Sequence, residues 1–404
     1  MPELSHIAII LLGIVGFAIL SRRLEGSIVT LPMFFAAFGW LIGRAGAELV
    51  PMTAEHDIIH TIAEITLVLA LFSDASRMRF HELTKTYTIP TRMLLVGMPL
   101  TILLGTLLAH WVSPDKSWVL ALLVAAILAP TDAALGQTVV TSPSVPSHLR
   151  QGINVESGLN DGLALPLVII AALLAAQQSG VEVEGVPGNL FVFSLMQVTF
   201  GPLAGVMTGY YFAKTLDVAI ESKLITITFQ GLYFLCVAFL AFTLAELIGG
   251  NGFIAVFVGG LVFGNTLRHP SSFINEFMES EGQLLTIFTF TIFGAVLVPI
   301  GLDHATWKTL VLAIGFLSVV RMLPIYLSLS GLALSDYEKL FLGWFGPRGL
   351  ASILFALLIV KRFPVPGSEE LLACVVLTVT LSIVLHGVTA KPMSEQFSHS
   401  QVAG

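Results

Sequence analysis

The sequence of 404 residues is poor in charge: Asp, Glu, Lys and Arg make up 11% of it, against about 25% in a typical soluble domain. Hydrophobic residues make up 55% of the chain, and the mean hydropathy is +0.90. These values exclude a soluble globular protein and predict a polytopic membrane protein. The net charge of -7 comes with no basic cluster, so nucleic acid is not an expected partner.

Cysteine is also scarce. Cys236 and Cys374 both lie in apolar runs, so we expect them to pack in the protein interior and to form no disulfide. The Cys/His spacing of a metal centre does not occur, and no cofactor is expected. The first 21 residues lack a charged segment and a small-residue cleavage site, which favours a first membrane span over a removed signal peptide.

Apolar runs long enough to cross a bilayer, about 20 residues each, recur along the whole chain. Placing loops at charges, prolines and glycines predicts an all-α protein with about thirteen transmembrane helices. The expected spans are 5–21, 27–47, 57–77, 91–112, 117–140, 152–177, 189–214, 224–247, 251–267, 283–302, 307–332, 337–361 and 370–390. The glycine-rich residues 249–252 are interpreted as a tight turn between two of these spans.

The distribution of basic residues predicts the orientation in the membrane. With the N-terminus outside, twelve basic residues face the cytoplasm and five face outward, as the positive-inside rule requires. We therefore expect a multi-pass protein of the cell membrane, surrounded by lipid, with an external N-terminus and a cytoplasmic C-terminus. Residues 393–404 form a short polar tail in this scheme.

Two of the expected spans are interrupted by proline or glycine next to a charge. The fifth is broken at residues 130–132 (Pro-Thr-Asp) and the twelfth at residues 346–349 (Gly-Pro-Arg-Gly). Because the two spans run in opposite directions, they predict a pair of crossed discontinuous helices in two inverted six-helix repeats. The repeats are residues 1–188 and 224–392, and residues 189–223 form a linker helix.

The prolines at the two breaks, Pro130 and Pro347, remove backbone hydrogen bonds and expose helix ends inside the membrane. Such freed groups are tolerated where they line a cavity or are buried in protein. Asp132 is placed to offset the positive charge of helix N-termini, and Arg348 the negative charge of helix C-termini. The sequence therefore predicts a polar site at the helix crossing.

The sixth span begins with Glu156, Ser157, Asn160 and Asp161 in an otherwise apolar segment. A carboxylate at the centre of a spanning helix costs roughly 2.5–3.5 kcal/mol to insert, so ion or proton handling is the expected reason for it. Ser157 lies one turn before Asp161 on the same face. Because hard monovalent cations prefer oxygen ligands, we predict that Asp161, Ser157 and Thr131 bind one, and that Asp161 alternates between cation and proton.

The remaining polar residues of the spans are expected to organise this site. Glu156 needs a buried partner, and Arg321 in the eleventh span is favoured for it, while Arg348 is assigned to the helix crossing. The Asn160 amide is expected to fasten the sixth helix to Asp132 or to Thr131. Because Asn160 carries no charge, one titrating group remains beside the cation, which favours one-for-one electroneutral exchange.

Two acids of the third span have weaker assignments. Glu64 lines a vestibule or makes a local hydrogen bond, with the local bond favoured. Asp74 either belongs to a cytoplasmic funnel or is an interfacial acid, and the sequence does not separate these alternatives. None of the ten histidines is singled out.

These residues resemble those of NhaP-type sodium/proton antiporters, which belong to the monovalent cation:proton antiporter family that includes the animal sodium/proton exchangers. The resemblance extends over the whole chain and rests on residues 130–132, 156–157, 160–161, 321 and 346–349. It implies an electroneutral transporter that exchanges sodium, or lithium or potassium, for protons by alternating access. It also implies a homodimer with a rigid dimer domain and a mobile six-helix core.

The same resemblance implies roles for individual residues. The aspartate at Asp161 binds the cation or the proton, and the arginine at Arg321 pairs with a glutamate. The residues surrounding the site are Glu156, Ser157, Thr131 and Asp132.

Three alternatives to a sodium/proton antiporter remain open at the level of the sequence. One is a potassium-preferring cation/proton antiporter, and a second is a cation channel. The third is an intramembrane aspartyl protease built on Asp132 and Asp161, although the Tyr-Asp and Gly-X-Gly-Asp motifs of such proteases are absent. We expect a transporter and no enzymatic activity.

Overall fold

The computed structural model describes residues 2–24, 28–49, 57–78, 88–132, 135–178, 190–269, 272–363, 365 and 367–402. These residues form helices and the segments between them, with no strand in the described part of the chain. Eight of the described helices are long and apolar enough to cross a membrane, and four shorter ones are also apolar. The expected all-α membrane protein is confirmed.

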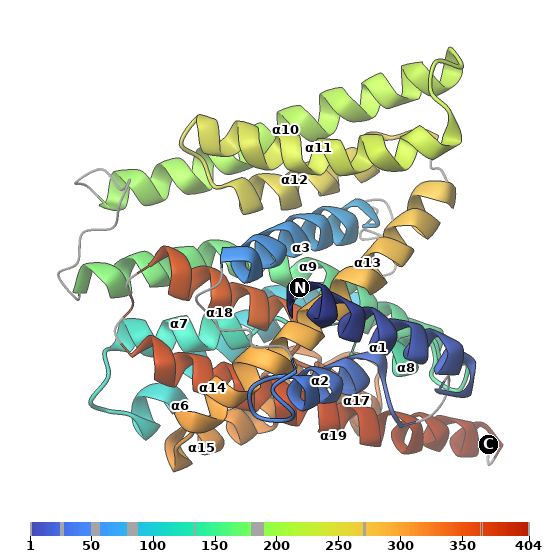
Figure 1. Ribbon diagram of the computed structural model, residues 1–404. Coiled ribbons are helices and arrows are strands. Elements are labelled where there is room, and N and C mark those ends of the chain that lie inside the picture. Colours follow the sequence, from blue (N-terminus) through green and yellow to red (C-terminus); the bar gives the residue numbers. More distant parts are fainter. Residues whose placement is uncertain are drawn as a thin grey trace.

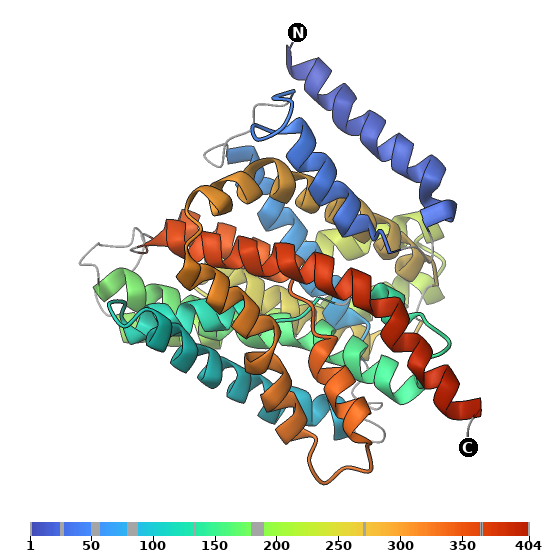
Figure 2. The same cartoon turned by 90° about the horizontal axis from the view of Figure 1, so that it is seen from below.

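The first part of the chain supplies the first broken span and the helix that carries Asp161. Its elements are α1 (Pro2–Leu24), α2 (Leu31–Ile42), α3 (Asp57–Ser76), α5 (Thr88–Arg92), the π-helix η1 (Met93–Gly97), α6 (Met98–Val112), α7 (Trp118–Leu128), α8 (Gln137–Val140) and α9 (Ser147–Gln178). Figure 2 shows α1 at the edge of the bundle.

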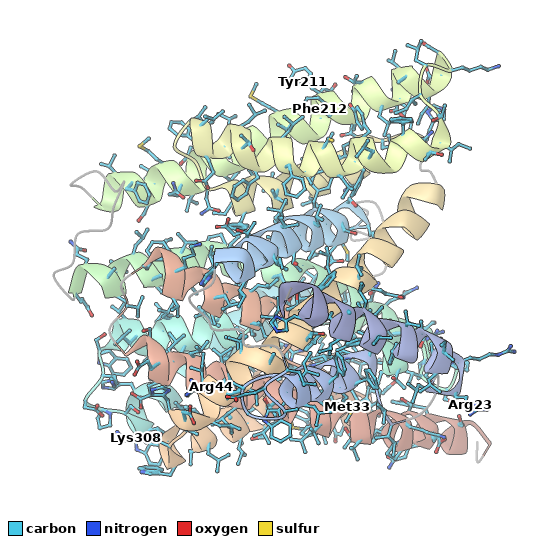
Figure 3. The ribbon with its side chains drawn as sticks, in the orientation of Figure 1. Arg23, Met33, Arg44, Tyr211, Phe212 and Lys308 are labelled. Carbon is cyan, nitrogen blue, oxygen red and sulfur yellow. The ribbon has the colours of Figure 1, made fainter. Side chains whose placement is uncertain are left out.

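Three helices form a layer along one side of the molecule: α10 (Leu190–Glu221), α11 (Ile227–Leu247) and α12 (Gly252–Thr266). Figure 1 shows them stacked at the top of the view, and α12 packs between α10 and α3. Tyr211 and Phe212 are labelled on α10 in Figure 3, and the Tyr211 side chain is exposed. The predicted turn between α11 and α12 is confirmed, and Glu246 Oε1 accepts a hydrogen bond from the Gly252 N–H across it at 2.9 Å.

The rest of the chain supplies the second broken span. Its elements are α13 (Ser272–Ile292), the π-helix η2 (Phe293–Leu297), α14 (Val298–Asp303), α15 (Trp307–Leu317), α16 (Val319–Ser328), α17 (Asp336–Trp344), α18 (Leu350–Arg362) and α19 (Ser368–Val402). α19 crosses the middle of the view in Figure 2 and packs against α14, α15 and α18.

Several helices begin at a side chain that satisfies a free backbone N–H, as expected for helix N-termini. Ser117 Oγ accepts from the Leu120 N–H at 3.2 Å at the start of α7. Thr306 and Ser335 form capping boxes at the starts of α15 and α17. These caps place the helix ends close to the boundaries that the sequence predicted.

Both predicted breaks are present: α7 ends at Leu128 and α8 begins at Gln137, and α17 ends at Trp344 and α18 begins at Leu350. A third interruption, at Ser318 between α15 and α16, was not predicted. Ser318 Oγ donates to the Ile314 carbonyl at 2.6 Å, a local bond that competes with regular helix geometry.

Other helices differ in length from their expected spans. α9 begins five residues earlier than expected, and α19 continues to Val402, so residues 393–402 are helical and continuous with the last span. Apolar runs mark the part of a helix that lies in hydrocarbon, whereas the helix itself can extend into water.

Candidate functional site

The C-terminal end of α7 meets side chains from the second break. Arg348 Nε donates to the carbonyl oxygen of Leu128, the last residue of α7. Ser352 Oγ donates to the Ile127 carbonyl at 2.8 Å. A helix C-terminus carries unpaired carbonyls and partial negative charge, so a guanidinium and a hydroxyl both stabilise it. The predicted place of Arg348 at a negative helix end is confirmed.

Asp132 makes the reciprocal contact with the N-terminus of α18. Its Oδ2 accepts a hydrogen bond from the N–H of Leu350, the first residue of α18, at 2.7 Å. Its own backbone N–H donates to the Pro347 carbonyl at 2.8 Å. A carboxylate at a helix N-terminus stabilises the positive end of that helix. Asp132 therefore lies at a positive helix end, as the sequence predicted, and each break stabilises a helix end of the other.

Two glycines of the 346–349 motif are required by the close approach of charged side chains. A Cβ atom at Gly346 would overlap the guanidinium of Arg321, and one at Gly349 would overlap the carboxylate of Asp132. Glycine lets a backbone come this close because it has no side chain. The two glycines therefore leave room for the Arg321 side chain of α16 and for the Asp132 side chain of the first break.

Three polar side chains meet where α9 passes the first break. Thr131 Oγ1 lies 3.0 Å from Ser157 Oγ, and Asn160 Nδ2 donates to Thr131 Oγ1 at 2.6 Å. All three side chains are buried. Of the two partners predicted for the Asn160 amide, Thr131 is the one that accepts from its nitrogen. Within the described residues, Asn160 Oδ1 has no hydrogen-bond partner and no backbone N–H donates to the Thr131 carbonyl.

Asp161 lies on α9 next to this cluster with an unsatisfied carboxylate. Its Oδ1 is buried and accepts no hydrogen bond from the part of the chain that the structure describes. The carboxylates of Asp132 and Asp74 both repel the Asp161 carboxylate electrostatically, and Asp74 is the exposed member of the three. Like charges that share a region repel one another less when a cation or a proton is bound between them.

Glu156 and Arg321 form the buried pair that the sequence predicted. Arg321 Nη1 and Nη2 donate to Glu156 Oε1 and Oε2 at 2.5 and 2.6 Å, and the two side chains are 2% and 1% exposed. Bidentate geometry of this kind gives the strongest carboxylate–guanidinium contact. Because both carboxylate oxygens accept from Arg321, Glu156 joins α9 to α16.

Sequence reasoning did not single out two buried polar residues of α19. Ser382 Oγ accepts from the Arg348 N–H at 2.7 Å, and His386 Nε2 lies 2.8 Å from the Trp344 carbonyl oxygen. The available signal was the spacing of a serine and a histidine four residues apart inside an apolar span, which puts both on one helix face. Taken alone, that spacing does not reveal which element the face contacts.

Comparisons with known proteins agree with this fold. The family described as "Sodium/hydrogen exchanger, transmembrane" matches residues 7–396. The Na(+)/H(+) antiporter NhaH of Halobacillus dabanensis is 27% identical over 345 residues, which cover 82% of this chain and 82% of that protein. The K(+)/H(+) antiporter NhaP2 of Shewanella sp. (strain ANA-3) is 24% identical over 363 residues, which cover 88% of this chain and 60% of that protein.

A solved structure shows the same fold. The sodium proton antiporter MjNhaP1 from Methanocaldococcus jannaschii aligns with a TM-score of 0.75 and 20% identity, covering 98% of this chain and 99% of that one. The family match extends over most of the sequence and includes both helix breaks and Asp161. The chain therefore belongs to the sodium/hydrogen exchanger family.

Proposed function

We propose that the protein exchanges a monovalent cation for a proton across the cell membrane, and that Asp161 holds the one or the other. The supporting observation is the open Asp161 Oδ1 beside the polar cluster of Thr131, Ser157 and Asn160. Carboxylate, hydroxyl and carbonyl oxygens are the ligands that a hard monovalent cation prefers. The buried Oδ1 of Asp161, which accepts no hydrogen bond from the described residues, can take a proton in place of the cation. A site that accepts either ion, and not both together, couples the two flows.

The ligands that we assign to the cation are the Asp161 carboxylate, the Ser157 hydroxyl and Thr131. Asp132 holds the N-terminus of α18 close to the site, and Asn160 fixes the Thr131 hydroxyl. The cation and the proton are substrates in this scheme, and no cofactor takes part.

Asp74 is assigned to the approach path of the cation. It is exposed, it lies near the end of α3, and its carboxylate acts electrostatically on Asp161. An acid in this position raises the local concentration of cations outside the binding site. Of the two sequence alternatives, this arrangement favours the funnel over an interfacial acid.

Sodium is the cation that we propose first, with lithium and potassium as alternatives. The relatives include both a Na(+)/H(+) antiporter and a K(+)/H(+) antiporter, so family membership does not select between them. Asn160 supplies an amide at a position where an acid would add a second titrating group, which favours one-for-one electroneutral exchange.

Alternating access is the mechanism that we propose for this exchange. Hydrogen bonds join the two breaks directly, and the Glu156–Arg321 pair ties α9 to α16, so these elements form one connected unit. The α10–α12 layer lies along one side of the molecule (Figure 1) and packs on α3 and α9. We assign the connected unit to a mobile core and the layer to a static dimer domain of a homodimer.

This assignment keeps thirteen spans in two inverted six-helix repeats, with the N-terminus outside and the C-terminus in the cytoplasm. Labelling of cysteines introduced near Arg23 and near Val402 in intact cells tests the orientation. Both sites should fall on the cytoplasmic side, since one span precedes the first and thirteen precede the second.

Proton flux in proteoliposomes under sodium, lithium and potassium gradients tests the exchange itself. We expect Asp161→Asn to abolish flux under every gradient, and normal flux in this variant would refute the assignment. Asp303→Asn is the matched control, because it makes the same chemical change at an exposed carboxylate at the end of α14. Cation current without proton flux would indicate a channel, and strong dependence on an imposed voltage would exclude the electroneutral ratio.

A further inference from the structure

We propose that Ser382 and His386 on α19 are positioning residues for cation/proton exchange. They hold the break between α17 and α18, and through it the backbone at Thr131 and Asp132, in the geometry that binds the cation. This inference rests on the proposed function of the Asp161 site, and it assigns a role to a helix that contributes no ligand to that site.

The two side chains contact the break on both sides. On one side, His386 Nε2 lies 2.8 Å from the carbonyl oxygen of Trp344, the last residue of α17. On the other side, Ser382 Oγ accepts from the backbone N–H of Arg348 at 2.7 Å. The two side chains meet each other, because Ser382 Oγ lies 3.2 Å from His386 Nδ1.

These contacts form one connected chain. The Arg348 N–H donates to Ser382 Oγ, and His386 Nδ1 contacts both the Ser382 hydroxyl and, at 2.9 Å, the Ser382 carbonyl oxygen. In the tautomer protonated on Nε2, the ring donates to the Trp344 carbonyl, which is the contact that the proposal uses. The chain spans the unwound segment and replaces the backbone hydrogen bonds that Pro347 and the break remove.

The segment that this chain holds is connected to the cation site by two further bonds. The Asp132 N–H donates to the Pro347 carbonyl, and the Asp132 carboxylate accepts from the Leu350 N–H. Asp132 follows Thr131 directly, and Thr131 Oγ1 contacts Ser157. A shift of the second break therefore moves the Thr131–Asp132 backbone relative to α9.

Not every buried hydroxyl of α19 contacts another helix. Thr378, one turn before Ser382, is equally buried, but its Oγ1 donates to the Cys374 carbonyl of its own helix. A polar side chain inside a span is costly unless it is paired. His386 is 1% exposed, and its Nε2 contacts α17, from which Trp344 Nε1 also donates to Thr389 Oγ1 at 2.9 Å.

The experiment measures the KM for sodium and the Vmax of exchange in proteoliposomes for the wild type and four variants: Ser382→Ala, His386→Leu, His386→Gln and Thr378→Val. Ser382→Ala and His386→Leu should each raise KM about 3- to 10-fold, as expected for the loss of one buried hydrogen bond. His386→Gln should restore most of the affinity, because its amide nitrogen can donate in place of Nε2. Thr378→Val should leave KM unchanged.

Thermal unfolding of each purified variant separates positioning from folding. The proposal is overturned if Ser382→Ala and His386→Leu keep the wild-type KM while only their melting temperatures fall. It is also overturned if His386→Gln binds sodium no better than His386→Leu. If His386→Leu does not fold, the KM values of Ser382→Ala and His386→Gln still decide. Absence of exchange in the wild type would instead refute the proposed function itself.

Discussion

The two helix breaks are built alike but differ in the atoms that they leave without a partner. A continuous helix covers each of them: α9 covers the first with Ser157 and Asn160, and α19 covers the second with Ser382 and His386. At the first break the buried unpaired atoms are acceptors, Asp161 Oδ1 and Asn160 Oδ1. At the second, the hydroxyl and the imidazole of α19 both have hydrogen-bond partners.

Among the described residues, the buried side-chain atoms without a hydrogen-bond partner at the second break are donors, Arg348 Nη2 and Arg321 Nε. Unpaired acceptors attract a cation or a proton, whereas an unpaired guanidinium N–H repels both. The comparison supports the proposed cation site at the first break and a supporting role for the second. The proposed site lies where acceptors outnumber donors, and a broken helix by itself is not sufficient.

The largest effect is expected from the Glu156–Arg321 ion pair, which joins α9 to α16. Glu156→Leu leaves Arg321 buried without a counter-charge, which should destabilise the protein by about 3–5 kcal/mol. The double variant Glu156→Leu/Arg321→Leu should recover much of this loss, because no buried charge remains. Chemical denaturation in detergent measures the free energy of unfolding of both variants. Equal losses in the single and double variants would show that the loss does not come from an unpaired buried charge.

A smaller loss is expected where the first break stabilises the second. Asp132→Ala removes the acceptor of the Leu350 N–H and should cost about 1.5–3 kcal/mol. Asp132→Asn keeps an acceptor and loses the charge at the helix N-terminus, which should cost only about 0.3–1 kcal/mol. The same denaturation assay compares them, and an Asn variant as unstable as the Ala variant would show that the charge, and not the hydrogen bond, matters most.

Gly349→Ala tests the close approach of the two breaks. The added methyl overlaps the Asp132 carboxylate, so we expect a loss of about 1–3 kcal/mol together with weaker sodium binding. Gly282→Ala on α13 is the matched control, since its Cβ would meet nothing within 4 Å. Wild-type sodium affinity in Gly349→Ala would show that the Asp132 contact does not shape the site.

The smallest effect is expected from an ion pair outside both breaks. Lys308, labelled in Figure 3, donates to Asp115 Oδ1 at 3.1 Å, and this hydrogen bond lowers the pKa of the Asp115 carboxyl. A lowered folded-state pKa means that the contribution to stability is present at neutral pH and is lost as pH falls through that pKa. Lys308→Met should leave exchange unchanged at neutral pH, with a melting temperature close to that of the wild type.

Much of this architecture could be predicted from the sequence. Prolines and glycines beside a charge located both breaks, because they are costly within a span and mark backbone that must be satisfied elsewhere. The Glu156–Arg321 pair was predictable because a buried acid needs a partner and few buried bases exist. The interruption at Ser318 was not, since serine is compatible with a helix and no proline or glycine beside a charge marks this position.

The partner of a side chain depended on how the helices cross. Composition and spacing by themselves determined the membrane class, the two broken spans and the polar face of α9, because these follow from local chemistry along one chain. Only the tertiary structure decided that Asn160 donates to Thr131, that His386 contacts Trp344, and that acceptors remain open at Asp161. Hydrogen bonds between helices depend on the mutual approach of segments far apart in sequence, and that approach is set by packing of the whole bundle.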